Sequence, residues 1–422
     1  FYYIGVVLAS HEIDAVEEVY INGKKVVLDE QGFVTSAPFW QNGPPDQVFS
    51  TEPLVDGGAS GKSWDRGNSR AQISIRLGRD DQPADPILIV DFPSLGADFR
   101  QQGHATLVMK CHYGKDYDEF SKVWGGAAPT PQALFRGKKV YDPRKAEQVV
   151  DDKSTWAWSR SPTLCATDYL RHEYGGRLGN SSYDWVRNGN GARVDETAVK
   201  TRSGAVEPQY TLDAIIDTSA SAVDVLRAML LCNRGRFGQT SNGLVIMPGA
   251  WSDPVMTIHD GMLAGGIDYQ ADALRKNVLN TVRTRIIDPE SQYALVDGPT
   301  YRNEAFIVAD GQEYATTLDL NFVEGGARAQ RLANALVVNS RLGRALRLPL
   351  DIEAMILEPG DTVTVDLTIA SMCNGTYVVE RVSFTESFTA VEVDLVETSR
   401  EVGYFDPSVD EVEWTAARTV SE

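Results

Sequence analysis

The sequence has 422 residues, of which 42% are hydrophobic and 23% are charged; these values are typical of globular proteins and exclude a disordered tail. A chain of this length predicts about two to four domains of roughly 100–200 residues each. The formal net charge is −19, with 59 acidic against 40 basic residues, which argues against non-specific binding of nucleic acid, since that binding needs Lys and Arg at the phosphates. An acidic lining would instead let DNA pass without adhering.

The cysteines and the hydropathy of the chain indicate the compartment in which it folds and whether it crosses a membrane. The four cysteines contain no closely spaced pair, so we interpret them as isolated, mostly buried thiols of a reducing cytoplasm. No apolar stretch approaches the roughly 18 residues that a transmembrane helix requires. The segment Phe1–Ala9 is apolar but has no charged n-region and no initiator Met. It is therefore predicted to be a strand within an internal piece of a longer protein, not a signal peptide.

Residues 1–150 are predicted to form a β-rich domain. Asn22-Gly23 lies between two β-branched runs, which is typical of a hairpin turn. Residues 36–70 are rich in Gly, Pro, Ser and Asp and are predicted to be a long loop. Further strands are expected at Ala71–Leu77, in the apolar run Leu88-Ile89-Val90 and at Ala105–Lys110, and a loop is expected at 116–131.

Residues 151–264 are predicted to form an α+β domain. Ser161-Pro162 favours the start of a helix, and a second helix is expected from either Tyr183 or Gly191 to Thr201. The strongest helical pattern runs from Ser219 to Cys232, with apolar residues on one face. The other expected elements are a strand at Gln209–Asp213 and a hairpin over residues 235–247.

Residues 265–400 are predicted to form a second β-rich domain that carries one helix, at Ala327–Leu342. Its expected strands are Val278–Ile287, Ala345–Pro349, Thr362–Leu367, Tyr377–Thr385 and Thr389–Val396. Residues 401–422 are interpreted as an acidic exit segment, of which Asp406–Glu422 leaves the domain.

No catalytic constellation emerges from the sequence. The five histidines are not spaced as metal ligands, and there is no G-x-S-x-G elbow. Gly58–Ser63 ends in Gly-Lys-Ser but lacks the spacing of a phosphate-binding loop. The remaining candidates are interpreted as surface or packing residues: the carboxylates Glu17, Glu18 and Glu386, the calcium-like Asp260, Gly261 and Asp361, and the aromatic cluster Trp156, Trp158, Tyr169, Tyr174, Tyr183 and Trp185. The protein is therefore predicted not to be an enzyme and to need no cofactor or metal.

The stretch Phe135–Arg144 is a basic island in this acidic chain. Val140 and Tyr141 suit a short strand, which Asp142-Pro143 ends because proline has no N–H for a sheet. Within it, the segment Gly137–Arg144 reads Gly-Lys-Lys-Val-Tyr-Asp-Pro-Arg. This segment resembles a motif of the central tail hub, or tail-tip host-specificity, family of long-tailed phages (lambda J-like). Other segments that match this family in order are His11–Asp14 with Val19–Lys24, Leu77-Gly78 and Gln82 with Arg100–Tyr113, Trp158–Pro162 with Asp168–Leu170, Asn277–Pro289, and Ala329–Ala335 with Glu358–Asp361.

The resemblance covers roughly residues 5–400 and implies an α+β, β-rich fold with two β-barrel-like hub domains flanking an inserted α+β domain. It departs from the family at Ser161, where Asn is usual, and it lacks a counterpart of the family's C-terminal receptor-binding region. It implies a structural tail-tip hub of a siphophage that closes the distal end of the tail tube as a homotrimer and helps host attachment and DNA delivery. The implied partners are the tail tube, the distal tail protein, other tail-tip proteins, and the tape measure protein or DNA in the lumen, without membrane insertion by this segment.

The implied location is the tail tip of the virion, after assembly in the bacterial host cytoplasm. Two similar β domains per chain would let a threefold hub meet a sixfold tube. The basic residues Arg136, Lys138, Lys139 and Arg144 are predicted to contact acidic groups of a neighbouring subunit, with a solvated basic turn as the other interpretation. Two further functions stay open at this point, a cell-wall hydrolase carried on a hub and a receptor-binding adhesin.

Overall fold

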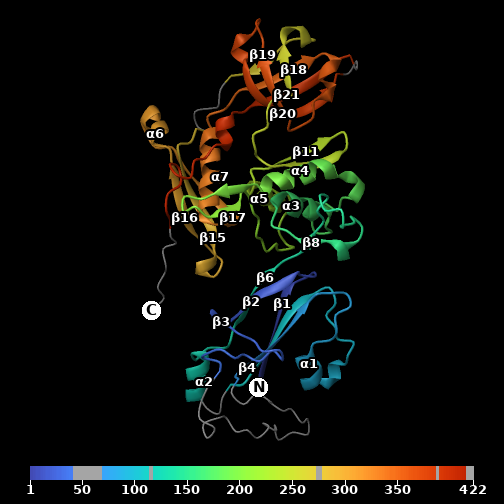
Figure 1. Cartoon of the computed structure of the whole chain (residues 1–422), viewed down its shortest axis with the longest axis vertical. Helices are drawn as coiled ribbons and strands as arrows, with labels where there is room; N and C mark the ends of the chain where they lie inside the picture. Colours follow the sequence, from blue (N-terminus) through green and yellow to red (C-terminus); the bar gives the residue numbers. More distant parts are fainter. Residues whose placement is uncertain (41–68, 114–116, 272–277, 386–388, 415–422) are drawn as a thin grey trace. The chain divides into compact units, whose positions relative to one another are not determined.

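The computed structural model describes residues 1–40, 69–113, 117–271, 278–385 and 389–414. The chain separates into two compact units, Phe1–Lys139 and Val140–Glu422 (Figure 1). Each unit has its own apolar core. The described part is a mixed α+β fold rich in strands, with seven α-helices, which confirms the predicted class. Most of the loop predicted at 36–70, including Gly58–Ser63, lies outside the described residues, as does Glu386.

The first unit contains two sheets of three strands, ordered β1-β5-β4 and β3-β2-β6, in which all neighbours are antiparallel. Its strands are β1 (Tyr2–Ala9), β2 (Ala15–Ile21), β3 (Lys24–Val26), β4 (Ala71–Leu77), β5 (Ala105–Cys111) and β6 (Pro131–Arg136). The predicted hairpin turn is confirmed: Asn22 and Gly23 have φ angles of 51° and 72°, as a tight turn between β2 and β3 requires. Side chains from both sheets share one apolar cluster.

Two helices of the first unit were not predicted. The run Leu88-Ile89-Val90 lies in α1 (Pro86–Asp91), so its assignment to a strand was wrong. The loop expected at 116–131 was also wrong, because α2 (Tyr117–Trp124) occupies part of it. Trp124 is buried, and its ring lies 5.2 Å from that of Phe39, a packing partner that is distant in sequence.

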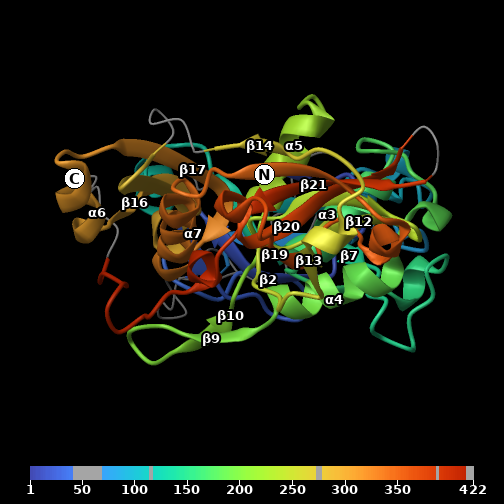
Figure 2. The same cartoon turned by 90° about the horizontal axis from the view of Figure 1, so that it is seen from above.

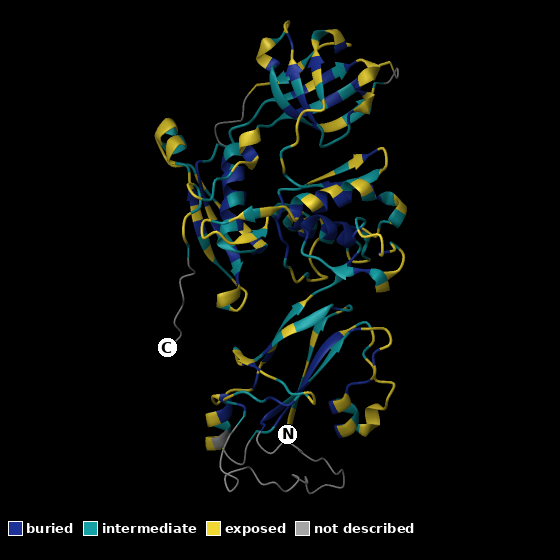
Figure 3. Ribbon diagram, viewed as in Figure 1, coloured by how far each residue is buried: buried dark blue, intermediate teal, exposed yellow. Residues whose placement is uncertain are grey.

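The second unit begins with a cluster of helices. These are α3 (Pro162–Arg171), α4 (Trp185–Asp195) and α5 (Ala222–Leu231), and all three were predicted. Of the two starts considered for α4, the structure has the earlier one. The hairpin predicted over 235–247 is confirmed as β11 (Arg236–Thr240) and β12 (Gly243–Met247). In Figure 3 much of α3 is dark blue, in keeping with the burial of most of its side chains.

The strand predicted at Gln209–Asp213 was wrong. The N–H groups of Gln209 and Tyr210 donate to Thr197 and Asp195 at the end of α4, whereas that of Leu212 donates to Arg160, and the structure assigns no strand to these residues. The short strands of this region are instead β7 (Lys139–Val140), β8 (Ala157–Trp158), β9 (Ala198–Lys200) and β10 (Val206–Pro208).

A three-stranded sheet, ordered β16-β15-β17, follows along the chain. Its strands are β15 (Thr281–Asp288), β16 (Ala294–Arg302) and β17 (Ala315–Glu324), with α6 (Glu304–Asp310) between β16 and β17. The helix predicted at Ala327–Leu342 is α7 (Gly326–Asn339), and it packs on all three strands. Figure 2 shows α7 beside β16 and β17. The sequence predicted β15 and α7 but neither β16 nor β17.

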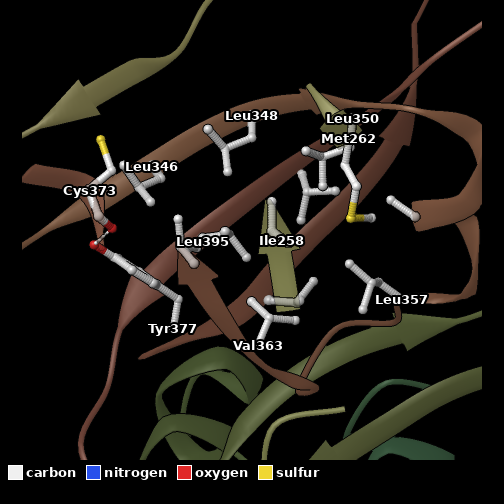
Figure 4. Packing of buried hydrophobic residues seen from close by; sticks show 14 of the residues in the cluster. Ile258, Met262, Leu346, Leu348, Leu350, Leu357, Val363, Cys373, Tyr377 and Leu395 are labelled. Atoms are coloured by element: carbon white, nitrogen blue, oxygen red, sulfur yellow. Dashed lines mark hydrogen bonds between the residues drawn. The ribbon is translucent and has the colours of Figure 1, made fainter. Parts of the chain in front are cut away.

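The largest sheet has six strands in the order β13-β19-β20-β21-β18-β14. The strands are β13 (Met256–His259), β14 (Asp268–Gln270), β18 (Ala345–Leu350), β19 (Thr362–Asp366), β20 (Gly375–Phe384) and β21 (Val391–Glu397), of which the last four were predicted. Although β13 and β14 stand at opposite edges, only residues 260–267 join them. This connection bridges to β18, where Leu263 pairs with Leu350. The sheet therefore curls around its core, in which Ile258 is fully buried (Figure 4).

The segment that follows β21 lies against α7 and does not leave the unit before residue 412. The side chain of Gln330 donates to the carbonyl of Val412 at 2.9 Å and accepts from the N–H of the same residue at 2.7 Å. Asn334 donates to the carbonyl of Tyr404 at 2.8 Å. The bound backbone carries side chains that face outward, because Tyr404 and Val412 are 67% and 56% exposed.

Candidate functional site

The basic stretch is divided between the two units, because the boundary falls between Lys139 and Val140. On the side of the first unit, Arg136 lies at the end of β6, and its Nε donates to Glu17 at 2.7 Å. Lys139 donates to Glu12 at 3.0 Å. Lys138 is partly buried beside them. Two of the predicted contact residues therefore already have acidic partners within this chain.

Arg144 forms the centre of the part that belongs to the second unit. Its Nε donates to Asp142 at 2.8 Å and its Nη2 at 2.7 Å, which gives a bidentate pair. The two terminal nitrogens also donate to both carboxylate oxygens of Glu196, at 2.6 and 2.8 Å. A planar guanidinium suits this fork geometry, whereas an ammonium does not.

Burial and charge together set the protonation of this cluster. Burial raises the pKa of Asp142, but the hydrogen bonds from Arg144 outweigh this effect and hold that pKa below its usual range. The hydrogen bonds to Asp142 and Glu196 raise the pKa of Arg144. The side chains of Asp142 and Arg144 are only 6% and 16% exposed, whereas that of Glu196 is 46% exposed. Asp142 and Arg144 therefore stay charged at neutral pH.

The turn at residues 142–148 packs closely on α4. A Cβ atom at Gly189 would lie 3.2 Å from Cγ of Arg144 and 3.3 Å from Cγ of Pro143, so a larger residue would push the turn away. The turn is closed by Gln148, which accepts a hydrogen bond from the N–H of Asp142 at 2.7 Å. Glu196 caps the C-terminal end of the same helix. Arg144 and Glu196 thus make contact although they lie 52 residues apart in the sequence.

Aromatic rings fix the neighbouring Tyr141. Its ring meets that of Trp185 edge-on, at a centroid distance of 5.0 Å, and lies 6.4 Å from that of Trp156. The guanidinium of Arg171 lies over both tryptophan rings, at 4.7 Å from Trp156 and 5.4 Å from Trp185. These rings pack on one another, in agreement with their interpretation as packing residues.

A buried carboxylate, Asp195, joins the helices behind this surface. It accepts from the hydroxyl of Ser161 at 2.6 Å, from the N–H of Thr163 at 2.9 Å and from the side chain of Asn233 at 3.0 Å. Its side chain has no exposed surface, and burial raises its pKa despite these hydrogen bonds. Ser161 therefore both caps α3 and binds α4, a double contact that the sequence analysis did not find.

A cavity of about 170 Å³ opens beside the Arg144 cluster. Its lining residues are Asp142, Arg144, Lys145, Gln148, Ala157, Trp158, Ser159 and Glu196. Among these, the sequence analysis had singled out only Arg144 as a contact residue and Trp158 as part of the aromatic cluster. No local sequence pattern predicts that Glu196 lies beside Arg144, because the fold brings these two distant residues together.

The described residues offer no metal centre: no group of three or more His, Cys, Asp or Glu side chains among them is placed to hold an ion. Within the same residues, no α-helix combines the length and the apolar character needed to cross a membrane. The arrangement around Arg144 is thus one of charged and hydrogen-bonding groups suited to binding.

Residues 221–380 match the model of a family described as putative phage tail protein. No curated protein matches the chain. A solved structure titled as the virion of a native gene transfer agent particle contains a chain with 16% identity; the likeness covers 97% of this chain and 80% of that one, with a TM-score of 0.56.

Two crystal structures of tail proteins resemble parts of the chain more weakly. The tail protein from Neisseria meningitidis has 15% identity, with 47% of this chain and 61% of that one covered and a TM-score of 0.34. The prophage MuSo2 43 kDa tail protein from Shewanella oneidensis has 12% identity, with 44% and 53% covered and a TM-score of 0.30. The matched residues 221–380 confirm the resemblance to a phage tail protein family, and the first structure shows a shared fold.

Proposed function

We propose that this phage tail structural protein is the tail-tip hub of a siphophage, which closes the distal end of the tail tube as a homotrimer and helps host attachment and DNA delivery. The observation that carries the proposal is the fold shared over 97% of the chain with a chain of a gene transfer agent virion. The family match over residues 221–380 supports a structural role in the tail. The proposed role involves no catalysis.

The curled six-stranded sheet is the proposed second hub domain. Its connection at 260–267 runs from one edge to the other, and residues of β13 and β18 share one core, as a barrel-like domain requires. The two sheets of the first unit, which enclose a common cluster, are the proposed counterpart. Two such domains per chain, repeated three times, would present six β surfaces to a sixfold tube.

The proposed partners are two further copies of this chain, the tail tube, the distal tail protein and other tail-tip proteins, with the tape measure protein or DNA in the lumen. The net charge of −19 supports a lumen through which DNA slides without adhering. The proposed location is the tail tip of the virion, reached after assembly in the host cytoplasm.

The predicted inter-subunit role of Arg136, Lys138, Lys139 and Arg144 stays a proposal. Arg136, Lys139 and Arg144 pair with acidic groups of their own chain. Contacts with a neighbouring subunit would have to add to these pairs or replace them. Since the partners Glu12, Glu17 and Glu196 are each more than a third exposed, the pairs are accessible to a second chain.

The test combines light scattering on the purified protein with electron microscopy of the particle. A trimer mass and threefold density at the end of the tube are expected. A protein that is monomeric at every concentration, with no density at the tail tip, would contradict the hub. Release of peptidoglycan by the purified protein would favour the hydrolase instead, and a block of phage adsorption would favour the adhesin.

A further inference from the structure

The cavity beside Arg144 is lined by hydrogen-bond donors that the described part of the chain does not use. All of its lining residues lie between Asp142 and Glu196, so the cavity belongs to one compact unit. Its size, about 170 Å³, is below the roughly 300–1,000 Å³ of sites that hold drug-sized molecules. A space of this size suits one side chain better than an oligosaccharide or a nucleotide.

The acidic groups of the cavity are already engaged. Both oxygens of Asp142 and both oxygens of Glu196 accept hydrogen bonds from Arg144. The guanidinium also offsets part of their negative charge. The two carboxylates are therefore poor sites for a cation or for a ligand that must donate hydrogen bonds.

Gln148 is the most informative lining residue, because it is only 7% exposed yet has an unused donor. Its Oε1 accepts from the N–H of Asp142 at 2.7 Å, which sets the orientation of the amide. Its Nε2 donates to none of the described residues, and the residue lines the cavity. This amino group is not among the buried polar atoms that lack a partner, so it is reached from the cavity and can donate to an acceptor placed there.

Two further donors face the same space. Lys145 is exposed and forms no ion pair with the residues that the structure describes. The Oγ of Ser159 accepts from the N–H of Ser161 at 3.1 Å, which leaves its O–H free to donate. An ammonium, an amide and a hydroxyl together match the several lone pairs of one carboxylate. Trp158 adds an aromatic wall for the aliphatic part of the ligand.

We propose that this cavity binds the carboxylate of an Asp or Glu side chain from a second copy of this chain. The copy is the favoured source because the chain carries 59 acidic residues against 40 basic ones, so its surfaces offer carboxylates in excess. The inference rests on the proposed trimer and assigns Lys145, Gln148 and Ser159 as contact residues. Arg144 then has a positioning role, since it holds Asp142 and with it the turn that carries Gln148.

Zero-length cross-linking tests this contact directly. A carbodiimide joins a lysine amine to a carboxylate only when the two touch. Trimers formed from equal amounts of unlabelled and ¹⁵N-labelled chain are cross-linked and digested, and the joined peptides are identified by mass. We expect Lys145 to be joined to an Asp or Glu of the other isotopic copy.

Two variants control the experiment. Lys145→Arg keeps the charge but offers no amine, so the cross-link at this position should disappear while the trimer remains. Gln148→Glu keeps the acceptor for Asp142 but places a negative charge in the cavity. This variant should weaken trimer formation at least about tenfold, because like charges across an interface cost several kcal/mol.

The possible outcomes separate the two proposals. A stable trimer in which Lys145 forms no cross-link between copies, and which Gln148→Glu leaves unchanged, would overturn the carboxylate site and leave the hub intact. A protein that never trimerises would overturn the hub and, with it, this site. A cross-link between Lys145 and a carboxylate of its own copy alone would also overturn the site.

Discussion

Arg144 donates to both carboxylate oxygens of Glu196, at 2.6 and 2.8 Å, while it holds both oxygens of Asp142 with the same guanidinium. The contact joins the first turn of the second unit to the C-terminal end of α4. Arg144, which the sequence placed in an isolated basic segment, thus anchors the first turn of the second unit to α4.

Replacement of Arg144 by Ala should lower the free energy of unfolding by about 3 kcal/mol, because Asp142 would remain buried without its charge partner. Glu196→Gln is the matched control: its carboxylate is 46% exposed, so the loss should stay below about 1 kcal/mol. Urea unfolding followed by tryptophan fluorescence would measure both changes. Equal losses in the two variants would contradict this assignment.

The pH dependence of stability should reveal Asp142. Because its pKa is lower in the native state than in the unfolded chain, its contribution should be complete above about pH 5 and be lost as the pH falls through about 4 towards the native pKa. Asp142→Asn should remove this part of the loss of stability in acid.

Burial raises the pKa of Asp195, so this residue should contribute to the pH dependence with the opposite sign. Asp195→Asn should therefore make the fall of the unfolding free energy with decreasing pH steeper. Unfolding free energies measured across this range test both signs.

The buried ion pair between Lys110 and Asp91 should contribute to the stability of the first unit. Lys110 lies 2.7 Å from Asp91, with side chains 5% and 2% exposed, and Tyr3 also donates to Asp91 at 2.9 Å. Lys110→Met should cost about 3–5 kcal/mol because an unpaired charge stays buried. Tyr3→Phe should cost only about 1 kcal/mol. The double variant Lys110→Met with Asp91→Leu should recover most of the loss.

Hydrogen exchange of β5 in the full chain measures these effects within the first unit. Faster exchange over residues 105–111 is expected for Lys110→Met, with near-normal exchange in the double variant. Unchanged protection in the single variant would show that the pair does not stabilise this sheet.

The segment bound to α7 should detach when Gln330 is replaced. Gln330→Leu removes both hydrogen bonds to Val412, whereas Gln330→Glu removes only the donated one, so the first should have the larger effect. Limited proteolysis should then cut residues 404–414 several-fold faster than in the wild type. Gln312→Leu, at an exposed position, is the control and should leave the rate unchanged.

Sequence patterns predicted those elements whose burial pattern is local. The apolar faces of α5 and α7 and the alternation in β20 and β21 follow from periodicity alone. The helix α2 escaped because it buries Trp124 against a residue far away in the chain, and the two glycines after it were interpreted as a loop although they end a helix. In contrast, α1 could have been found, since Asp85-Pro86 is a cap followed by proline at the first helical position.

In the candidate site, too, the sequence pointed to the residue with a local pattern and missed those that the fold brings to it. The sequence singled out Arg144 within a distinctive motif and predicted a contact with a neighbouring subunit, which stays a prediction. It gave no sign of Glu196, which meets Arg144 only because α4 packs on the turn at Gly189. Lys145 and Gln148 carry no sequence pattern that would have pointed to them, and their proposed role follows from their place in the lining of the cavity.

The two hydrogen bonds between Gln330 and Val412 also determine which element first resists a force applied to the C-terminal end of the chain. Two hydrogen bonds to one residue run side by side, so a pull on the chain beyond residue 412 would load both bonds at once before it reached β21. The first element to bear that pull would be α7, which lies on the sheet of β15, β16 and β17. The curled six-stranded sheet would thus be shielded from strain transmitted along the C-terminal side of the chain.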